Sequence, residues 1–460
     1  MTSPPPPDTP QQWHARIWQL SLPIIFSNIS VPLVGAVDTA VVGHLATVEL
    51  IGAVALGASI FSLVFWTFGF LRMATSGLVA QAYGENQGNN RTISLTFWRS
   101  VLVATLLACC VLALQKPLLT LSLWLLGTDT ALNQPTAEYY RIRIWAAPAT
   151  LANYVILGTF IGQQQMRAVL VFQLFLNLLN IFLDLLFVPV FGWGIKGVAG
   201  ASVISEYAAL ALGMLLIRKS ISIPVRQFQS GSLLEPKALK RLFTLNTNIF
   251  VRTLLLVLSF FYFNAKSAGL GAVSLAANAI VLQILHICAY ALDGFAHAVE
   301  TLSGQAWGSK KRRHFYNAVK YSTIQSAMVA AALSLIIALS GSHLIALFTN
   351  QPEVIEIANM LLPWLVSLPI ISVWCYQLDG IFIGTTHSRE MRNAMVFSAF
   401  VFLITAQWLT PQLGNTGLWL SFSLFMITRA LSLLFYYPKI LNSQHFTEIQ
   451  SSEVPDAHST

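Results

Sequence analysis

The chain has 460 residues, of which 55% are hydrophobic and 10% are charged, and its formal net charge is +8 at pH 7. A soluble protein carries about 25% charged residues, so a soluble protein of this length could not cover its surface with so few. Lipid can cover an apolar surface, and we therefore expect an all-α integral membrane protein. The bases lie in short segments between apolar runs, which favours membrane orientation over nucleic-acid binding.

The two ends of the chain are polar. The first residues are rich in proline and lack the pattern of a cleavable signal peptide. We expect disordered tails at 1–14 and 442–460. The four cysteines lie in apolar runs without metal-ligand spacing, so we expect buried thiols rather than a metal site.

Twelve apolar segments are long enough for a membrane helix, which needs about 20 residues. Several exceed that length, so tilted helices or ends that project into water are expected. In chain order the predicted helices are 15–43, 50–82, 93–115, 137–162, 168–190, 198–218, 240–265, 274–305, 316–348, 354–385, 392–412 and 416–438.

The loops between these helices predict an orientation. With the N-terminus inside, the inside segments hold most of the lysines and arginines, whereas the outside loops hold only Lys116, Lys196 and Lys266. This bias predicts that both termini are cytoplasmic.

The sequence also repeats. Gln-Ala-Tyr-Gly at 81–84 recurs as Gln-Ala-Trp-Gly at 305–308, and Phe-Ile-Gly at 160–162 recurs at 382–384. The order and the nearly constant offset indicate two six-helix lobes with the same orientation in the membrane, related by an axis along the membrane normal. The predicted domains are a first lobe at 15–218, a cytoplasmic linker at 219–239 and a second lobe at 240–441.

Acidic residues within these helices mark candidate functional sites. Inserting a carboxylate at the centre of a membrane helix costs roughly 2.5–3.5 kcal/mol in free energy. The default interpretation of such a residue is therefore that it has a function. Asp38 lies well inside the first helix, after Pro32, which kinks a helix, and Gly35, which adds backbone freedom. The alternative to a functional role is that the Asp38 side chain reaches the outer membrane interface and that the kink at Pro32 is static.

The fifth helix carries a polar stripe on an otherwise apolar segment. Asn177, Asn180 and Asp184 are spaced by three and four residues, so they share one face. The stripe predicts a cavity, and the alternative is a hydrogen-bonded seam between helices. Asp38 and Asp184 have no acidic counterparts at the repeated positions of the second lobe.

The second lobe has acids of its own. Asp293 and Glu300 share a face of the eighth helix, and Asp379 lies in the tenth. We treat all three as secondary candidates, because each could instead form a structural salt bridge. Arg72 and Arg252 are potential partners.

Motifs of soluble enzymes and nucleotide-driven pumps are absent from the sequence. It contains no P-loop, G-x-S-x-G or H-E-x-x-H motif, and no third ligand joins His286 and His297 on their helix face. We expect no enzyme activity, no cofactor and no resident metal. An integral-membrane lipid enzyme would need a clustered catalytic set, and two repeated lobes suit alternating access better than a pore.

Three segments resemble one transporter family. The Val-Asp-Thr-Ala-Val-Val-Gly-His-Leu run at 37–45, Ala-Gln-Ala-Tyr-Gly-Glu at 80–85 and Leu-Asp-Gly-Ile-Phe-Ile-Gly at 378–384 are similar to the DinF-like branch of the multidrug and toxin extrusion (MATE) family. The resemblance covers about 15–440. It implies a V-shaped, cation-coupled, monomeric antiporter of the bacterial inner membrane that exports amphipathic, often cationic compounds and contacts only these and lipid.

The resemblance also implies roles for individual residues. Bending of the first helix at Pro32 is the implied switch. The implied site residues are Asp38, Asn180 and Asp184 for the cation or proton, Tyr139 (or Tyr140) and Ser202 as their hydrogen-bond partners, Asn153 together with the striped Asn177 for the substrate cavity, and Asp379 as the counterpart of a second-lobe acid in another branch.

Two questions stay open at this point. Two carboxylates in a dehydrated cavity repel each other, which favours a shared proton as the coupling ion. Na⁺ bound by Asp38, Asn180 and Asp184 is the alternative. A flippase for lipid-linked precursors is the alternative function, and it would need a cationic central cavity.

Overall fold

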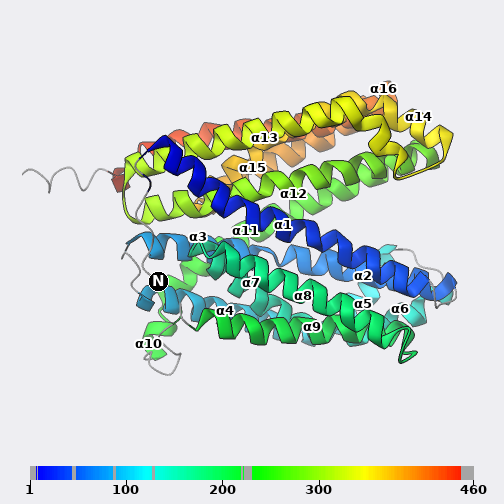
Figure 1. The fold of residues 1–460 in the computed structure, drawn as a ribbon, viewed down its shortest axis with the longest axis horizontal. Helices are drawn as coiled ribbons and strands as arrows, with labels where there is room; N and C mark the ends of the chain where they lie inside the picture. Colours follow the sequence, from blue (N-terminus) through cyan, green and yellow to red (C-terminus); the bar gives the residue numbers. More distant parts are fainter. Residues whose placement is uncertain are drawn as a thin grey trace, which may run out of the picture. The chain divides into compact units, whose positions relative to one another are not determined.

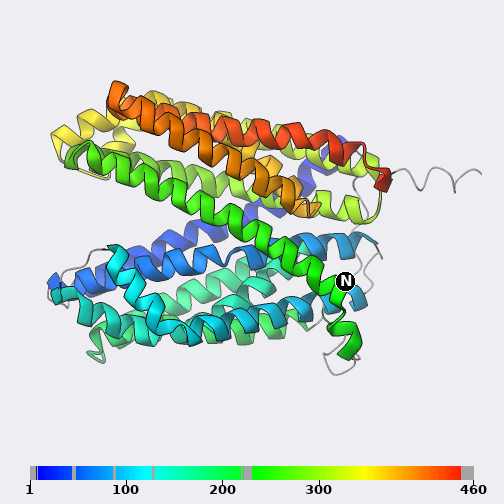
Figure 2. The same cartoon turned by 180° about the vertical axis from the view of Figure 1, so that it is seen from behind.

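The computed structural model describes residues 7, 9–43, 48–85, 90–126, 130–218, 221 and 230–446. All regular structure in these ranges is helical (Figures 1 and 2). Ten helical stretches among them are long and apolar enough to cross a membrane. The expected all-α membrane fold is confirmed.

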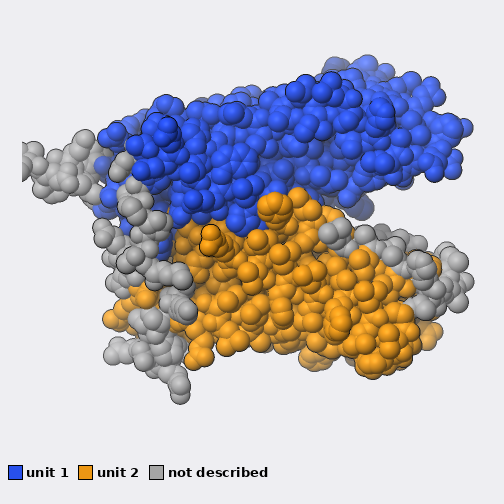
Figure 3. Space-filling view, viewed as in Figure 1, with its two compact units in different colours: residues 1–25, 80–88, 247–460 blue, residues 26–79, 89–246 orange. Residues whose placement is uncertain are grey.

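The helices cluster into two compact units (Figure 3). Unit 1 contains residues 1–25, 80–88 and 247–460, and unit 2 contains residues 26–79 and 89–246. Unit 1 thus holds most of the expected second lobe and unit 2 most of the first. The division falls inside three helices rather than in the linker.

The chain passes through unit 2 first, apart from the two short segments that belong to unit 1. Its elements, including the three divided helices, are α1 (Pro10–Gly43), α2 (Val48–Thr67), α3 (Phe70–Glu85), α4 (Asn90–Ala113), α5 (Gln115–Leu126), α6 (Thr130–Arg143), the 3₁₀ turn η1 (Ile144–Ala146), α7 (Ala147–Gly162), α8 (Met166–Phe187), α9 (Gly194–Ile217), α10 (Ser230–Leu233) and α11 (Pro236–Gly269).

Unit 1 contains the remaining helices. Within it α12, α13 and α15 pack side by side (Figure 1). The elements are α12 (Ala272–Gly308), α13 (Arg312–Ala346), α14 (Pro352–Met360), α15 (Leu362–Gly384), α16 (Ser388–Leu441) and η3 (Gln444–Phe446).

The predicted segments coincide with these elements, but several boundaries differ. The segment at 50–82 is divided into α2 and α3, 137–162 is interrupted by η1, and 354–385 is divided into α14 and α15. Hydropathy continues through these breaks, so it gives no sign of them. The last two segments are joined in α16, which kinks at Gly414 with φ 59°. A positive φ is readily available only to glycine.

The ends are more ordered than expected. Helix α1 begins at Pro10 rather than near 15, because Trp13 is buried and stacks on Tyr321 with ring centroids 6.3 Å apart. The expected C-terminal tail contains η3, where His445 stacks on Trp307 at 4.4 Å.

The expected linker is also partly helical. It contains α10 and the first turn of α11. Arg99 of α4 donates to the carbonyl of Leu233 at 3.3 Å and pairs with Glu235 at 3.1 Å. These contacts hold the end of the linker against α4.

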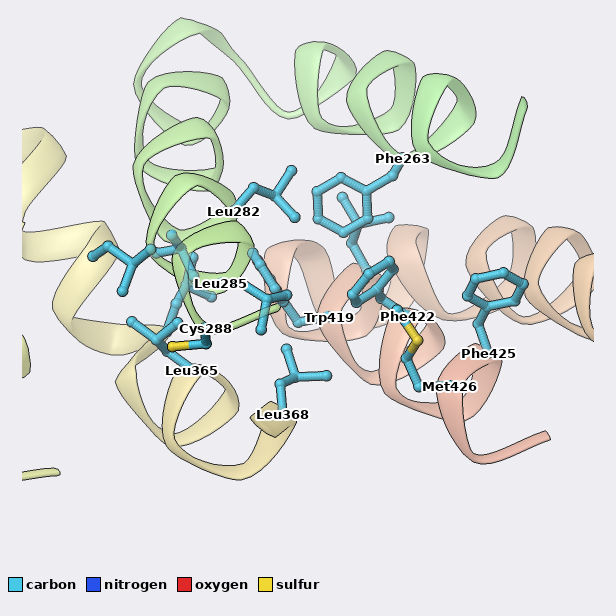
Figure 4. Packing of buried hydrophobic residues seen from close by; sticks show 14 of the residues in the cluster. Phe263, Leu282, Leu285, Cys288, Leu365, Leu368, Trp419, Phe422, Phe425 and Met426 are labelled. Carbon is cyan, nitrogen blue, oxygen red and sulfur yellow. The ribbon is translucent and has the colours of Figure 1, made fainter. Parts of the chain in front are cut away.

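An aromatic cluster forms the core of unit 1. Phe263 on α11 packs against Trp419 and Phe422 on α16, with centroids 5.1 and 5.4 Å apart (Figure 4). The Trp419 indole donates to Asn278 of α12 at 2.8 Å, so the buried ring keeps its hydrogen bond.

Each unit contains the same glycine-mediated helix crossing. In unit 2 a Cβ on Gly158 or Gly162 of α7 would lie 2.5 or 2.7 Å from the carbonyl oxygens of Arg72 or Ser76 on α3. In unit 1, Gly380 and Gly384 of α15 meet carbonyls of α12 in the same way. Pairs of small residues four apart let membrane helices approach closely. The sequence repeat is therefore also a repeat of packing.

Candidate functional site

The polar stripe of α8 lies in unit 2 and faces inward. Asn177 and Asn180 are each 7% exposed, and Asp184 is 0% exposed. Leu178 and Phe182 on the same helix are exposed, as expected for a face that contacts lipid. The predicted sharing of one buried face by the three polar residues is confirmed.

The two asparagines of the stripe bond to different helices. The Asn180 amide donates to the Ser202 hydroxyl of α9 at 3.4 Å. The Asn177 amide donates to the Ser30 hydroxyl of α1 at 2.6 Å. Asn177 therefore connects α8 to α1, so it has the interhelical hydrogen bond that the sequence left as an alternative to a cavity.

The predicted hinge and the first acid lie on α1. The helix runs through Pro32 and Gly35, and a Cβ added to Gly35 would meet no atom within 4 Å. Asp38 is in the same helix, but its side chain lies outside the described part of the structure. Ser30, which receives the bond from Asn177, lies half a turn before Pro32.

Tyr139 lies on α6 and is buried against α2. A Cβ on Gly57 of α2 would collide with its ring, and its centroid is 6.2 Å from that of Phe61. Tyr140 also packs on Phe61, with centroids 5.0 Å apart. The two tyrosines thus contribute to the α2–α6 interface.

Asn153 of α7 binds a residue that the sequence reasoning missed. Its amide donates to the Glu206 carboxylate of α9 at 2.8 Å and to the Glu206 carbonyl at 3.0 Å. Asn153 is 3% exposed, so in this structure it joins α7 to α9 rather than lining an open surface. Arg143, at the end of α6, lies 3.9 Å from the same carboxylate.

The signal for this cluster was present in the sequence. Glu206 and Arg143 are charged residues inside predicted helices, as Asp38 and Asp184 are. Arg429 in the second lobe satisfies the same criterion and was also missed.

In unit 1, Asp379 of α15 is bound by two arginines. Its Oδ2 lies 2.5 Å from Arg252 of α11 and also contacts Arg429 of α16. All three residues are buried. The expected pairing of Arg252 with a second-lobe acid is present.

The other two second-lobe acids lie on α12. Glu300 is buried and lies 2.9 Å from Nδ1 of His297, whereas Asp293 is partly exposed. Among the residues that the structure describes, no group of three histidine, cysteine or acidic side chains could hold a metal ion.

Comparison with known proteins identifies a family. The MatE family model matches residues 23–186 and 249–409, and the two matched stretches correspond to the two halves of the sequence repeat. The DNA damage-inducible protein F of Escherichia coli is 41% identical over 91% of this chain and 90% of its own length. A probable multidrug resistance protein NorM of Thermotoga maritima is 22% identical, with 91% of each chain covered.

Solved structures have the same fold. A MATE protein crystallised in a bent conformation superposes with a TM-score of 0.84 at 19% identity, covering 96% of this chain and 97% of its own. An outward-facing multidrug-resistance MATE transporter gives a TM-score of 0.81 and covers 94% of this chain and 96% of its own.

Proposed function

The chain belongs to the MatE family of membrane transporters, and on that premise we propose that it exports amphipathic, often cationic compounds in exchange for protons. It would do so by alternating access as a monomer in the bacterial inner membrane, with both termini in the cytoplasm. The relatives named for multidrug resistance and the parallel repeat support this function.

The observation that carries the proposal is the burial of Asp184. Its side chain is fully buried on a helix whose other faces are apolar. Burial disfavours the charged form of a carboxylate, so a proton taken up from the outside stabilises the buried carboxyl group. Asn180, one turn away on α8, and its hydrogen-bond partner Ser202 on α9 supply polar atoms to this region.

The Asn177–Ser30 bond offers a route from this site to the hinge. A change of charge on α8 alters the polar stripe, and Asn177 couples that stripe to α1 just before Pro32. Proline removes one intrahelical hydrogen bond, so α1 bends there at lower cost than elsewhere. Asp38, six residues further along α1, is the second proposed carrier of the proton.

We favour H⁺ over Na⁺ because Na⁺ needs several oxygen ligands at once. Asp38, Asn180 and Asp184 would have to provide most of them. A proton needs only one carboxylate oxygen, and two neighbouring carboxylates can share it.

A flippase for lipid-linked precursors is less well supported. It would need a cationic site for a pyrophosphate, and the two buried second-lobe arginines share the carboxylate of Asp379. Family membership also disfavours an integral-membrane lipid enzyme.

The test is dye efflux in everted membrane vesicles with an imposed pH or Na⁺ gradient. We expect the pH gradient to drive wild-type transport, and Asp38→Asn and Asp184→Asn to abolish it at normal expression. Glu353→Gln, a matched change at an exposed acid of α14, should transport normally. Wild-type activity of Asp184→Asn would overturn the mechanism. Transport driven only by a Na⁺ gradient would show that Na⁺, rather than H⁺, is the coupling ion.

A further inference from the structure

Unit 2 contains a second polar cluster, beside the α8 stripe, that the proposed coupling mechanism does not use. It comprises Glu206 on α9, Asn153 on α7 and Arg143 where α6 ends. Asn153 donates to Oε2 of Glu206 at 2.8 Å, and Arg143 Nη2 lies 3.9 Å from Oε1. Three helices thus converge on one carboxylate.

Arg143 also lies against two aromatic rings of α2. Its guanidinium carbon is 5.3 Å from the centroid of Phe65 and 5.7 Å from that of Phe61. Both rings are buried, and the Tyr154 hydroxyl of α7 donates to the Phe65 carbonyl at 3.1 Å, which fixes this part of α2. Aromatic faces and a carboxylate are the groups with which proteins recognise organic cations.

The ion pair in this cluster is open. A closed pair between arginine and a carboxylate has N–O distances of about 2.7–2.9 Å, so 3.9 Å is too long for a hydrogen bond. Within the described residues, Nη1 of Arg143 and Oδ1 of Asn153 are buried without a hydrogen-bond partner. These two atoms could therefore accept or donate further hydrogen bonds. In a purely structural ion pair within an apolar region, such buried polar atoms would be expected to be paired.

The two charged side chains of this cluster are not fully enclosed. The Arg143 and Glu206 side chains keep 14% and 12% of their exposure. Arg143 is the last residue of α6 before the 3₁₀ turn η1. A 3₁₀ segment between two α-helices often marks a hinge, so this arginine lies where the backbone can adjust.

We propose that Phe61, Phe65 and Glu206 form a binding site for the cationic group of the exported compound, and that Arg143 occupies this site as an internal cation when no substrate is bound. The site selects hydrophobic monocations, because they can contact both rings and pair with one carboxylate. Entry of the substrate displaces Arg143 from the rings. This inference rests on the proposed export function and adds a substrate site to it.

The placement also brings substrate and coupling ion close together. Ser202 and Glu206 are four residues apart on α9 and therefore lie on one face, one turn from each other. Ser202 contacts the Asn180 of the proposed proton site. Protonation of Asp184 on α8 removes a negative charge from this region, so proton uptake weakens the attraction for a bound cation and favours its release.

The test is equilibrium binding of tetraphenylphosphonium to the purified full-length protein, without a gradient. Removing the internal competitor in Arg143→Met should tighten binding roughly tenfold. Glu206→Gln and Phe65→Leu should weaken it by a similar factor. Arg141→Met, at an exposed position of the same helix, is the matched control and should bind as the wild type does. Triphenylphosphine oxide, a neutral analogue, should bind Glu206→Gln and wild type equally.

Two outcomes would overturn the site. The first is that Arg143→Met and Glu206→Gln both bind tetraphenylphosphonium as the wild type does. The second is that these variants change the affinity for the neutral analogue as much as they change the affinity for tetraphenylphosphonium. If Glu206→Gln does not fold, Glu206→Asp keeps the charge but shortens its reach, and it should give intermediate affinity. Asp184→Asn separates this inference from the coupling mechanism, because it should lose transport, whereas Arg143→Met should still tighten tetraphenylphosphonium binding in that background.

Discussion

Arg252 and Asp379 lie on different helices of unit 1 and approach to 2.5 Å, with Arg429 on the same carboxylate oxygen. Two guanidinium groups on one carboxylate stabilise its charged form. This arrangement suits a structural clamp between α11, α15 and α16 better than a group that gains and loses protons.

We therefore predict that Asp379→Asn acts mainly on stability. Removing the carboxylate leaves two buried cations unpaired, which should cost about 3–5 kcal/mol. Thermal unfolding in detergent should show the loss, and Arg252→Met combined with Asp379→Asn should recover part of it. A stable Asp379→Asn protein that folds normally and cannot transport would move the coupling site to the second lobe.

The α3–α7 crossing should tolerate no added methyl group. A Cβ on Gly162 would lie 2.7 Å from the Ser76 carbonyl oxygen, and backbone cannot rotate away as a flexible side chain can. Gly162→Ala should lower the thermal stability markedly. Gly200→Ala on α9 is the control, because a Cβ there meets nothing within 4 Å and alanine favours a helix by about 1 kcal/mol.

The Asn177–Ser30 bond should affect transport more than folding. Interhelical hydrogen bonds in membrane proteins contribute about 0.6 kcal/mol on average, so Asn177→Ala and Ser30→Ala should each unfold only slightly more easily. If the bond couples α8 to α1, the double variant should transport no more slowly than either single variant. Additive losses of efflux rate would show that the two residues act separately.

The proposed hinge makes a separate prediction about α1. Pro32→Ala restores the hydrogen bond that proline removes and should stiffen the helix, slowing efflux while raising stability. Gly35→Ala adds a methyl group in open space and should give a smaller change in the same direction. Unchanged efflux by Pro32→Ala would place the conformational change elsewhere.

Acid should destabilise the protein in part through His387, between α15 and α16. Burial, the main cause, lowers the pKa of this imidazole below its ordinary value of 6.5. The unfolded chain then binds a proton at higher pH than the folded one, so this stability is lost as pH falls below that value. His387→Gln should flatten the fall in thermal stability between about pH 6.5 and 5. If the stability of this variant falls with pH as steeply as that of the wild type, other groups cause the loss of stability in acid.

Local sequence patterns predicted the helices well, because membrane length and helical periodicity are properties of short segments. The fifth segment, predicted at 168–190, is α8 at Met166–Phe187, and its polar stripe is buried as expected. The break between α2 and α3 was not predicted, because Phe68 and Gly69 continue the apolar run.

Partners across helices could not be read from the sequence. Nothing near Asn177 indicates Ser30, and nothing near Asp379 indicates that Arg429 joins Arg252, because these contacts depend on how distant helices pack. Glu206 is different. Its charge inside an apolar helix was visible, but its hydrogen bond to Asn153 appears only in three dimensions.

Helix α9 carries Ser202 and Glu206 on one face, and each of them accepts a hydrogen bond from a different neighbouring helix. A rotation of α9 about its own axis would lengthen both bonds in the same movement. In the proposed mechanism, a single rotation of α9 would therefore change the ion site and the substrate site in the same step, without a relay of contacts across the lobe.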